Sequence, residues 1–284
     1  MVILVAIGSA FFTAVINVYL KKIFSGASTR QLAPLNFALS SAIMLLFSPV
    51  YFYFKYSLHA VIYLSVIFIA DTIANYFYYT AIETNQVSYS SIFMSLSPIF
   101  TLLIFTTFIG TISLTTLISI LGIMISIYIL NLDHKTTIFE PILYIFKGRN
   151  YLGIAYAVFS SITAIFAKHV FSEGYINPPT LYLLRDIFIF ISLSLALKPK
   201  LSHYNEKIAA SMFIRALFGI ASMLLYFYAI SLGHVVLVTV VSNIYPAFIL
   251  IFSYFIFKEK FSYQKILAVL TILFFIGILS YNFK

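Results

Sequence analysis

The sequence predicts an all-α polytopic membrane protein whose ten transmembrane helices form two inverted five-helix repeats. Three observations support this fold class. The first is composition: of 284 residues, 62% are hydrophobic and only 9% are charged, whereas soluble domains are about half apolar and a quarter charged. The second is a series of ten apolar stretches, each long enough to cross a bilayer. The third is a proline-interrupted apolar stretch that recurs 148 residues further along the chain.

Each expected span meets the length of about 20 mostly apolar residues that a bilayer requires. The first stretch lacks a basic n-region and is longer than the apolar core of a signal peptide, so we expect a helix that stays in the chain. The breaks between stretches are short and carry turn or charged residues, except for a midpoint segment whose "IFEPILYIF" we expect to lie along the membrane interface. The ten expected spans are 2–20, 33–54, 58–82, 86–110, 114–132, 150–171, 179–197, 208–232, 234–257 and 263–282.

The chain divides into a first half (1–132), a connecting loop (133–149) and a second half (150–284), and the two halves match each other. With a shift of 148, seven of the 25 residues 78–102 are identical to residues 226–250, including Pro98 with Pro246. With a shift of 147, Lys21 matches Lys168. A recurring period of this kind indicates an internal repeat.

An odd number of helices in the repeat requires the second copy to enter the membrane from the opposite side. The distribution of basic residues agrees with this inversion: where a loop of one half is rich in lysine and arginine, the corresponding loop of the other half is poor in them. The first loop holds Lys21, Lys22 and Arg30, while its counterpart holds only Lys168. The basic loops together hold 12 lysines and arginines against three on the other side. Cytoplasmic loops are normally the basic ones, so this count places both termini outside.

The two interrupted helices are the strongest sequence indication of a binding site. In transporters with inverted repeats, Pro- or Gly-broken helices at matching positions mark the substrate site. Each proline frees a backbone carbonyl about one turn back, beside hydroxyl and amide groups that could hydrogen-bond a ligand; a tolerated kink is the alternative. These candidate residues are Ser95, Ser97 and Pro98 in the first half, and Ser242, Asn243, Tyr245 and Pro246 in the second.

Ionisable residues inside spans give a second set of candidates, because a charge at the bilayer centre costs at least about 2.5 kcal/mol. Asp71 shares a helical face with Asn75 and Tyr78. Two roles remain open for Asp71: a packing ion pair with Arg215, or a carboxylate that couples protons or binds a cationic substrate. Arg185 and Asp186 are adjacent and shallower in their span, so we assign them a structural role. Asn17 and Tyr226 are further candidates, and Tyr182 and Tyr228 weaker ones.

Four segments resemble the drug/metabolite transporter superfamily, specifically its EamA-like ten-helix permeases. They are "YYTAIETNQVSYSSIFMSLSPIFTLL", "YFYAISLGHVVLVTVVSNIYPAFILIF", "PPTLYLLRDIF" with Arg185, and "FKEKFSYQKILAVLTILFFIGILSY" with Glu259. The first half departs from the pattern at Thr111 and Ser40, where the family has an acid and an arginine. The resemblance implies cytoplasmic termini, in conflict with the charge count, and a central cavity that would include Asn17, Asp71, Asn75, Tyr78, Tyr226 and Asn243.

These features predict a secondary transporter of a small organic metabolite, working by alternating access, with export implied by the resemblance. An antiporter of nucleotide-sugar-like or phosphorylated ligands is the alternative, and an intramembrane lipid-modifying or non-transporting protein is a weaker one. We expect no enzyme activity, cofactor, metal or nucleic-acid partner: the chain has no cysteine, its five histidines are scattered, and no P-loop or catalytic motif is present. The expected partners are the substrate, the bilayer of a microbial cell membrane, and a coupling proton or ion.

Overall fold

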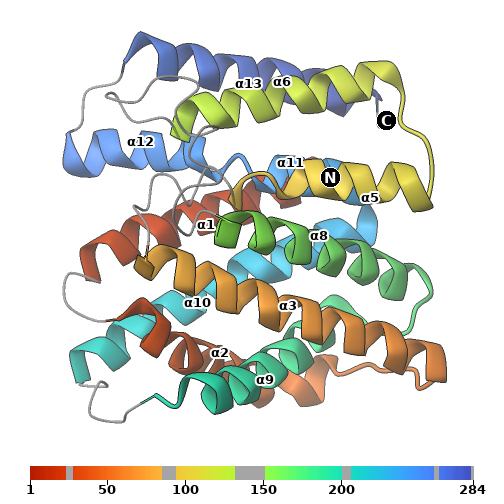
Figure 1. Ribbon diagram of the computed structural model, residues 1–284, viewed down its shortest axis with the longest axis vertical. Coiled ribbons are helices and arrows are strands. Elements are labelled where there is room, and N and C mark those ends of the chain that lie inside the picture. The colour runs from red at the N-terminus through yellow and green to blue at the C-terminus, as the bar shows by residue number, and fades with distance from the viewer. Residues whose placement is uncertain (24–27, 85–93, 132–150, 200–205, 259–261, 283–284) are drawn as a thin grey trace.

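The fold is built from apolar helices that all run between the same two sides of the molecule, with α3 crossing α9 and α10 at an angle (Figure 1). The computed structural model describes residues 1–23, 28–84, 94–131, 151–199, 206–258 and 262–282. In these ranges the chain forms helices and no strand, apart from an isolated bridge between Phe54 and Ile176. The helices are α1 (Val2–Ile23), α2 (Thr29–Tyr51), α3 (Leu58–Thr84), α5 (Ser97–Phe108), α6 (Leu114–Asn131), α8 (Tyr151–Ser172), α9 (Pro178–Leu197), α10 (Glu206–Leu232), α11 (Val235–Ser242), α12 (Tyr245–Phe257) and α13 (Tyr263–Asn282).

The expected membrane spans are confirmed as apolar helices. Six of them are long and apolar enough to cross a bilayer, and α11 and α12 together make one of the six. Four shorter apolar helices, at Val2–Val18, Ser97–Phe108, Leu114–Leu130 and Tyr263–Leu279, occupy the remaining expected positions. The interfacial "IFEPILYIF", the start of the fourth span and Glu259 lie outside the described residues.

Two details of the expected elements are wrong. Helix α2 begins four residues earlier than expected, because the Ser28 side chain caps it by accepting a hydrogen bond from the Gln31 backbone N–H at 3.3 Å. Lys168, which we had placed in a loop, lies inside α8, where its ammonium donates to the Ser231 carbonyl at 3.2 Å. That carbonyl belongs to the last turn of α10, a place where a cation is favourable.

The two halves pack on each other with the same pattern of contacts. Helices α1, α2, α3 and α5 of the first half correspond to α8, α9, α10 and α12 of the second. The contact of α3 with α8 has its counterpart in that of α10 with α1, the contact of α5 with α8 in that of α12 with α1, and the contact of α2 with α10 in that of α9 with α3. The corresponding helices α2 and α9 pair with each other, as do α6 and α13. Figure 1 shows the α6–α13 pair at one end of the molecule and the α2–α9 pair at the other. The interface between the halves is therefore the centre of the molecule.

Small residues allow the central helices to approach closely. On α1, Ala6, Ala10 and Ala14 are each fully buried and follow one another at intervals of four, so they form a single smooth face toward α10 and α11. Helices in lipid gain nothing from hiding apolar surface against one another, and small-residue faces favour association by close van der Waals contact.

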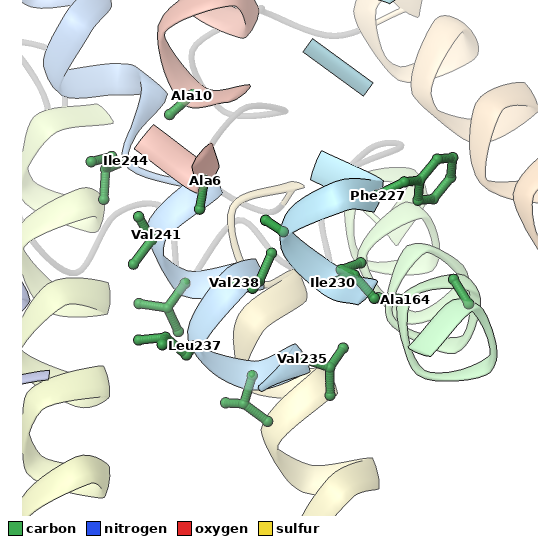
Figure 2. Packing of buried hydrophobic residues seen from close by; sticks show 14 of the residues in the cluster. Ala6, Ala10, Ala164, Phe227, Ile230, Val235, Leu237, Val238, Val241 and Ile244 are labelled. Atoms are coloured by element: carbon green, nitrogen blue, oxygen red, sulfur yellow. The ribbon is translucent and has the colours of Figure 1, made fainter. Parts of the chain in front are cut away.

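One side of the molecule, which we call the terminal side, carries the start of α1, the end of α13 and the turns 52–57, 109–113, 173–177 and 233–234. Just inside it, buried apolar side chains fill the space between the central helices (Figure 2). We call this group the apolar plug: Ala6, Ala10, Ala164, Phe227, Ile230, Val235, Leu237, Val238, Val241 and Ile244. All eight residues of α11 are buried in this region.

Hydrogen bonds close the terminal side between the halves, and we call this group the clasp. The Lys55 N–H donates to the Tyr175 carbonyl at 2.7 Å. The Asn177 amide donates to the Tyr51 carbonyl at 2.7 Å, and the Tyr53 N–H donates to the Thr180 hydroxyl at 2.9 Å. The clasp joins the segment after α2 to the turn between α8 and α9, residues 120 or more positions apart in the chain.

Candidate central site

Both proline-interrupted stretches break as the sequence predicts, and they break with the same geometry. Helix α5 begins at Ser97 and α12 at Tyr245, each with its proline in the first turn. The Ile99 N–H donates to the Leu96 carbonyl at 2.9 Å, and 148 residues later the Ala247 N–H donates to the Ile244 carbonyl at 2.9 Å. These tight turns replace ordinary helix bonds, so α5 and α12 each start anew at their proline; in the second span α11 precedes the break, while residues 85–93 of the first lie outside the described part.

The two breaks touch each other through a reciprocal pair of hydrogen bonds. The Asn243 amide donates to the Ser97 hydroxyl at 3.3 Å, and the Tyr245 and Ser95 hydroxyls hydrogen-bond each other. Under the 148-residue shift Ser95 corresponds to Asn243 and Ser97 to Tyr245. Each bond is thus the counterpart of the other under an exchange of the halves.

A third helix supports the first break. The Ser161 hydroxyl on α8 donates to the Ser97 carbonyl at 2.7 Å, and the Thr101 hydroxyl donates to the same carbonyl at 2.9 Å. In the second break the Ser242 hydroxyl is buried and has no hydrogen-bond partner in the part of the chain that the structure describes. A buried unpaired hydroxyl costs about 1–3 kcal/mol, so this group is available to a ligand or a water molecule.

A buried ionic cluster lies beside the breaks and joins the halves. Asp71 on α3 accepts from the Arg185 Nε on α9, and Asp186 accepts from the Arg185 Nη1 at 2.6 Å. The Ser40 hydroxyl on α2 also donates to Asp186. Asp71, Arg185 and Asp186 are each at most 6% exposed. Of the two roles left open for Asp71, the ion pair with Arg215 is not observed: its partner is Arg185, which, with Asp186, the sequence had suggested to be shallow.

Arg215 instead stacks on an aromatic side chain of the first half. Its guanidinium donates to the Tyr79 hydroxyl at 3.0 Å and lies 5.7 Å from the centre of that ring. Phe37 stands between the two arginines: it packs edge-on against Tyr79, at 6.3 Å between ring centres, and its ring lies 5.9 Å from the Arg185 guanidinium. Cation–π contacts of this kind are worth about 2 kcal/mol when desolvated.

Four tyrosines complete the site. Tyr78, Tyr156, Tyr226 and Tyr245 come from α3, α8, α10 and α12, and each ring keeps accessible surface although other helices surround it. The Tyr78 and Tyr156 ring centres are 5.5 Å apart. The hydroxyls of Tyr156 and Tyr226 lie near enough to Asp71 to feel its charge. At the other end of the site, the Tyr78 hydroxyl lies near Arg215.

The structure brings most of the sequence-predicted residues together, with one exception. Asp71 and Tyr226 meet at the acidic end, Tyr78 lies toward Arg215, and Asn75 donates to the Asp71 carbonyl at 2.8 Å. Asn17 does not join them through any contact of the described residues: its amide donates to the Thr13 carbonyl at 2.9 Å, which is the backbone of its own helix.

Sequence reasoning missed Tyr156 and Ser161 on α8. Both belong to the expected span 150–171, where hydroxyl-bearing side chains in an apolar stretch were the available signal. It also assigned Arg185 too little weight. In the sequence, Arg185 and the adjacent Asp186 suggest a pair whose charges cancel. The structure shows that Arg185 is shared between two carboxylates from different helices.

Comparison with known proteins now adds the family. The model of the EamA-like transporter family matches residues 1–132 and 149–281, which is nearly the whole chain. The chain therefore belongs to the EamA-like transporter family and is a multi-pass integral membrane protein. No curated protein matches it. A solved structure described only as a crystal structure of a protein shares the fold: TM-score 0.77, 12% identity, with 99% of this chain and 98% of that chain covered.

Chemically, the site offers hydroxyl and amide groups at two helix breaks, aromatic faces, and an acidic and a basic end. The new N-termini of α5 and α12 add the positive ends of two helix dipoles, which favour an electronegative group on a ligand, although the Ile99 and Ala247 N–H groups are themselves bonded to carbonyls. Among the described residues no group of three or more histidines or carboxylates could hold a metal ion.

Proposed function

We propose that the chain is a secondary transporter that carries a small organic metabolite by alternating access around the central site, with its two five-helix halves arranged as inverted repeats. The reciprocal hydrogen bonds between the breaks, Asn243 to Ser97 and Tyr245 to Ser95, carry this proposal. Broken helices that meet at the interface of two repeats are where transporters bind their substrates. A site shared equally by two halves can face either side as the halves rock.

The four tyrosines support a ligand with an aromatic or apolar body, because partly accessible rings in a protein interior offer stacking surface and hydroxyls together. The apolar plug and the clasp lie on the terminal side, and they support a conformation that is closed on that side. Export remains the proposed direction, from the family resemblance.

An antiporter of phosphorylated or nucleotide-sugar-like ligands is the second candidate, and Arg215 is the observation in its favour. Arg185 gives it little support, since two carboxylates already neutralise that guanidinium. A phosphorylated ligand would then depend on Arg215 and the helix N-termini.

The test is the melting temperature of the purified protein against a panel of metabolites: amino acids, aromatic amines, nucleobases, nucleotide sugars and phosphorylated compounds. A ligand at about 100 times its Kd stabilises by about 2.7 kcal/mol. We expect a hit that Asn243→Ala abolishes and Thr271→Ala preserves, since the Thr271 hydroxyl bonds only its own helix at 2.9 Å. The proposal fails if every hit survives Asn243→Ala, or if reconstituted protein moves none of the hits across a vesicle membrane.

Orientation is tested separately by labelling. Lys55 and Glu206 are exposed on opposite sides, and the chain has no native cysteine. The charge count predicts that an impermeant maleimide labels Lys55→Cys and not Glu206→Cys in intact cells. The reverse pattern would support the cytoplasmic termini that the family resemblance implies.

A further inference from the structure

The buried ionic cluster is not balanced in charge. Asp71 and Asp186 share the single guanidinium of Arg185. Arg215 bonds Tyr79 instead, and among the contacts of the described residues it makes none with either carboxylate. With both acids ionised, one negative charge in mid-membrane has no second cation in contact with it among the described residues, because Arg215 lies at the other end of the site. Such a charge is expensive unless it is paired or neutralised.

Asp186 is the carboxylate that Arg185 neutralises permanently. Its oxygens accept from the Arg185 Nη1 at 2.6 Å and from the Ser40 hydroxyl, and Tyr182 hydrogen-bonds it as well. Its side chain is 1% exposed. These donors and its burial leave the Asp186 carboxylate no room for another ligand.

Asp71 is the surplus carboxylate. Its Oδ2 accepts from the Arg185 Nε, but among the described residues its Oδ1 receives only the Asn75 amide, at 3.4 Å and so weakly. Its side chain is 9% exposed, against 1% for Asp186. Asp71 therefore has a free acceptor position and the better access.

The groups around Asp71 leave the surplus charge uncompensated. From α9 it faces Arg185 and Asp186, which cancel each other. From α8 and α10 it faces Tyr156 and Tyr226, which are neutral phenols. On its own helix the neighbouring polar group is Asn75, and the α2 contribution, Ser40, is directed at Asp186.

We propose that Asp71 is the proton-coupling site of the transporter. The inference rests on the proposed transport function and adds its coupling ion. A proton from the accessible side binds at Asp71 Oδ1. The cluster then consists of a neutral Asp71 and a neutral Arg185–Asp186 pair. The proton is released when the site faces the other side.

The location of Asp71 explains how one proton changes the conformation. Asp71 belongs to the first half and Arg185 to the second, so their ion pair is a bond between the halves. A protonated Asp71 no longer attracts the guanidinium, and Arg185 withdraws to Asp186 within its own helix. Protonation thus weakens the contact between the halves at the centre, which is what a coupling site must do.

The first experiment detects the proton directly and needs no substrate. Infrared difference spectra of the reconstituted protein, recorded as the pH is lowered, show a carboxylic-acid band when a buried carboxylate protonates. We expect such a band in the wild type, its loss in Asp71→Asn and its return in Asp71→Glu. Glu83→Gln, at an exposed carboxylate, should leave it unchanged. A band that survives Asp71→Asn and is lost in Asp186→Asn would overturn the assignment, as would a wild type without any such band.

The second experiment separates this inference from the proposed function. Proteoliposomes loaded with a compound from the melting-temperature screen receive a pH gradient or, in parallel, a sodium gradient. We expect the pH gradient to drive accumulation in the wild type and in Asp71→Glu, while Asp71→Asn only equilibrates the compound. If the wild type equilibrates the compound but neither gradient affects it, or only sodium does, the coupling inference fails and transport stands. If the wild type moves no compound, the proposed function fails, whatever the infrared result.

Discussion

Asn243 and Ser97 lie 146 positions apart in the chain, and the amide of one donates to the hydroxyl of the other at 3.3 Å. Ser97 is the first residue of α5 and Asn243 caps the end of α11 just before α12, so this contact joins the two breaks. The Tyr245–Ser95 bond is its counterpart. These two bonds between the breaks join neutral polar groups, which a ligand can replace with its own.

Asn243→Ala should therefore reduce ligand binding much more than stability. The lost bonds are to Ser97 and to the Thr239 carbonyl at 2.8 Å, from a partly buried side chain, and a hydrogen bond of this kind contributes about 1 kcal/mol. We expect a small fall in melting temperature and a loss of ligand-induced stabilisation. Ser161→Ala, which removes a buried bond to the Ser97 carbonyl, should show the opposite balance. Equal effects in the two variants would contradict a binding role for Asn243.

The two buried arginines should differ strongly in their effect on stability. Arg185→Gln leaves Asp71 and Asp186 facing each other without a cation, and breaking a buried ion pair costs about 3–5 kcal/mol. Arg215→Gln loses a hydrogen bond and a cation–π contact with Tyr79 and strands no carboxylate, so we expect about 1–3 kcal/mol. Thermal melts of the two variants in one detergent compare them, and a larger loss for Arg215→Gln would contradict the assigned pairing.

Much of the fold was predictable because bilayer length and apolar composition are local properties of the chain. The spans and the two breaks at Pro98 and Pro246 follow from them directly. The start of α2 was missed because a single cap, Ser28, decides it. Lys168 was misplaced because a lysine near a helix end can reach the carbonyl of another helix, and no local pattern records that.

The partners in the central site were less predictable. Asp71 and the break residues were identified from polarity in apolar surroundings, which needs no neighbours. Which cation Asp71 binds depends on how α3, α9 and α10 are rotated, and that is a property of packing. Arg215 and Arg185 looked equally suitable in the sequence, and only the positions of Tyr79 and Asp71 in space separate them.

Gly122 should be intolerant of substitution, while Gly277 should tolerate it. A Cβ added at Gly122 on α6 would lie 2.1 Å from a ring carbon of Phe275 on α13, whereas one added at Gly277 meets nothing within 4 Å. Forcing the Phe275 ring aside costs about 1–3 kcal/mol. Gly277→Ala should be neutral or stabilise by up to about 1 kcal/mol, since alanine is the better helix former. Melting temperatures of the two single variants test this, and similar values would mean that α6 and α13 do not pack as closely as described.

Stability should fall on acidification through His234. This residue lies in the turn between the spans Ile208–Leu232 and Val235–Phe255. Burial lowers the pKa of His234, and the charge of Lys168 lowers it further. The unfolded chain, with a histidine pKa of about 6.5, binds the proton more readily than the folded one. This contribution to stability is therefore complete above about pH 6.5 and is lost as the pH falls below it.

Melts across this pH range should show a shallower acid-side decline in His234→Gln than in the wild type. His59 is exposed, and His59→Gln serves as the control that should leave the profile unchanged. A decline that persists fully in His234→Gln would assign the effect to another group.

The clasp on the terminal side should control access to the central site from that side. Asn177 has two roles there: its amide bonds the Tyr51 carbonyl at 2.7 Å, and its side-chain oxygen caps α9 by accepting from the Thr180 N–H at 3.0 Å. Because Asn177→Ala removes both, we expect a loss of about 0.5–2 kcal/mol from the cap and a larger population open on the terminal side. A single cysteine at Val238, in the apolar plug, should then react faster with a maleimide, and the absence of native cysteines leaves this signal without background.

Ser57→Ala removes a cap on the same side, the bond from the Ala60 N–H at 3.0 Å, without touching the clasp. It should leave the labelling rate at Val238 unchanged, and equal acceleration in both variants would mean that fraying of helix ends, and not the clasp, governs access.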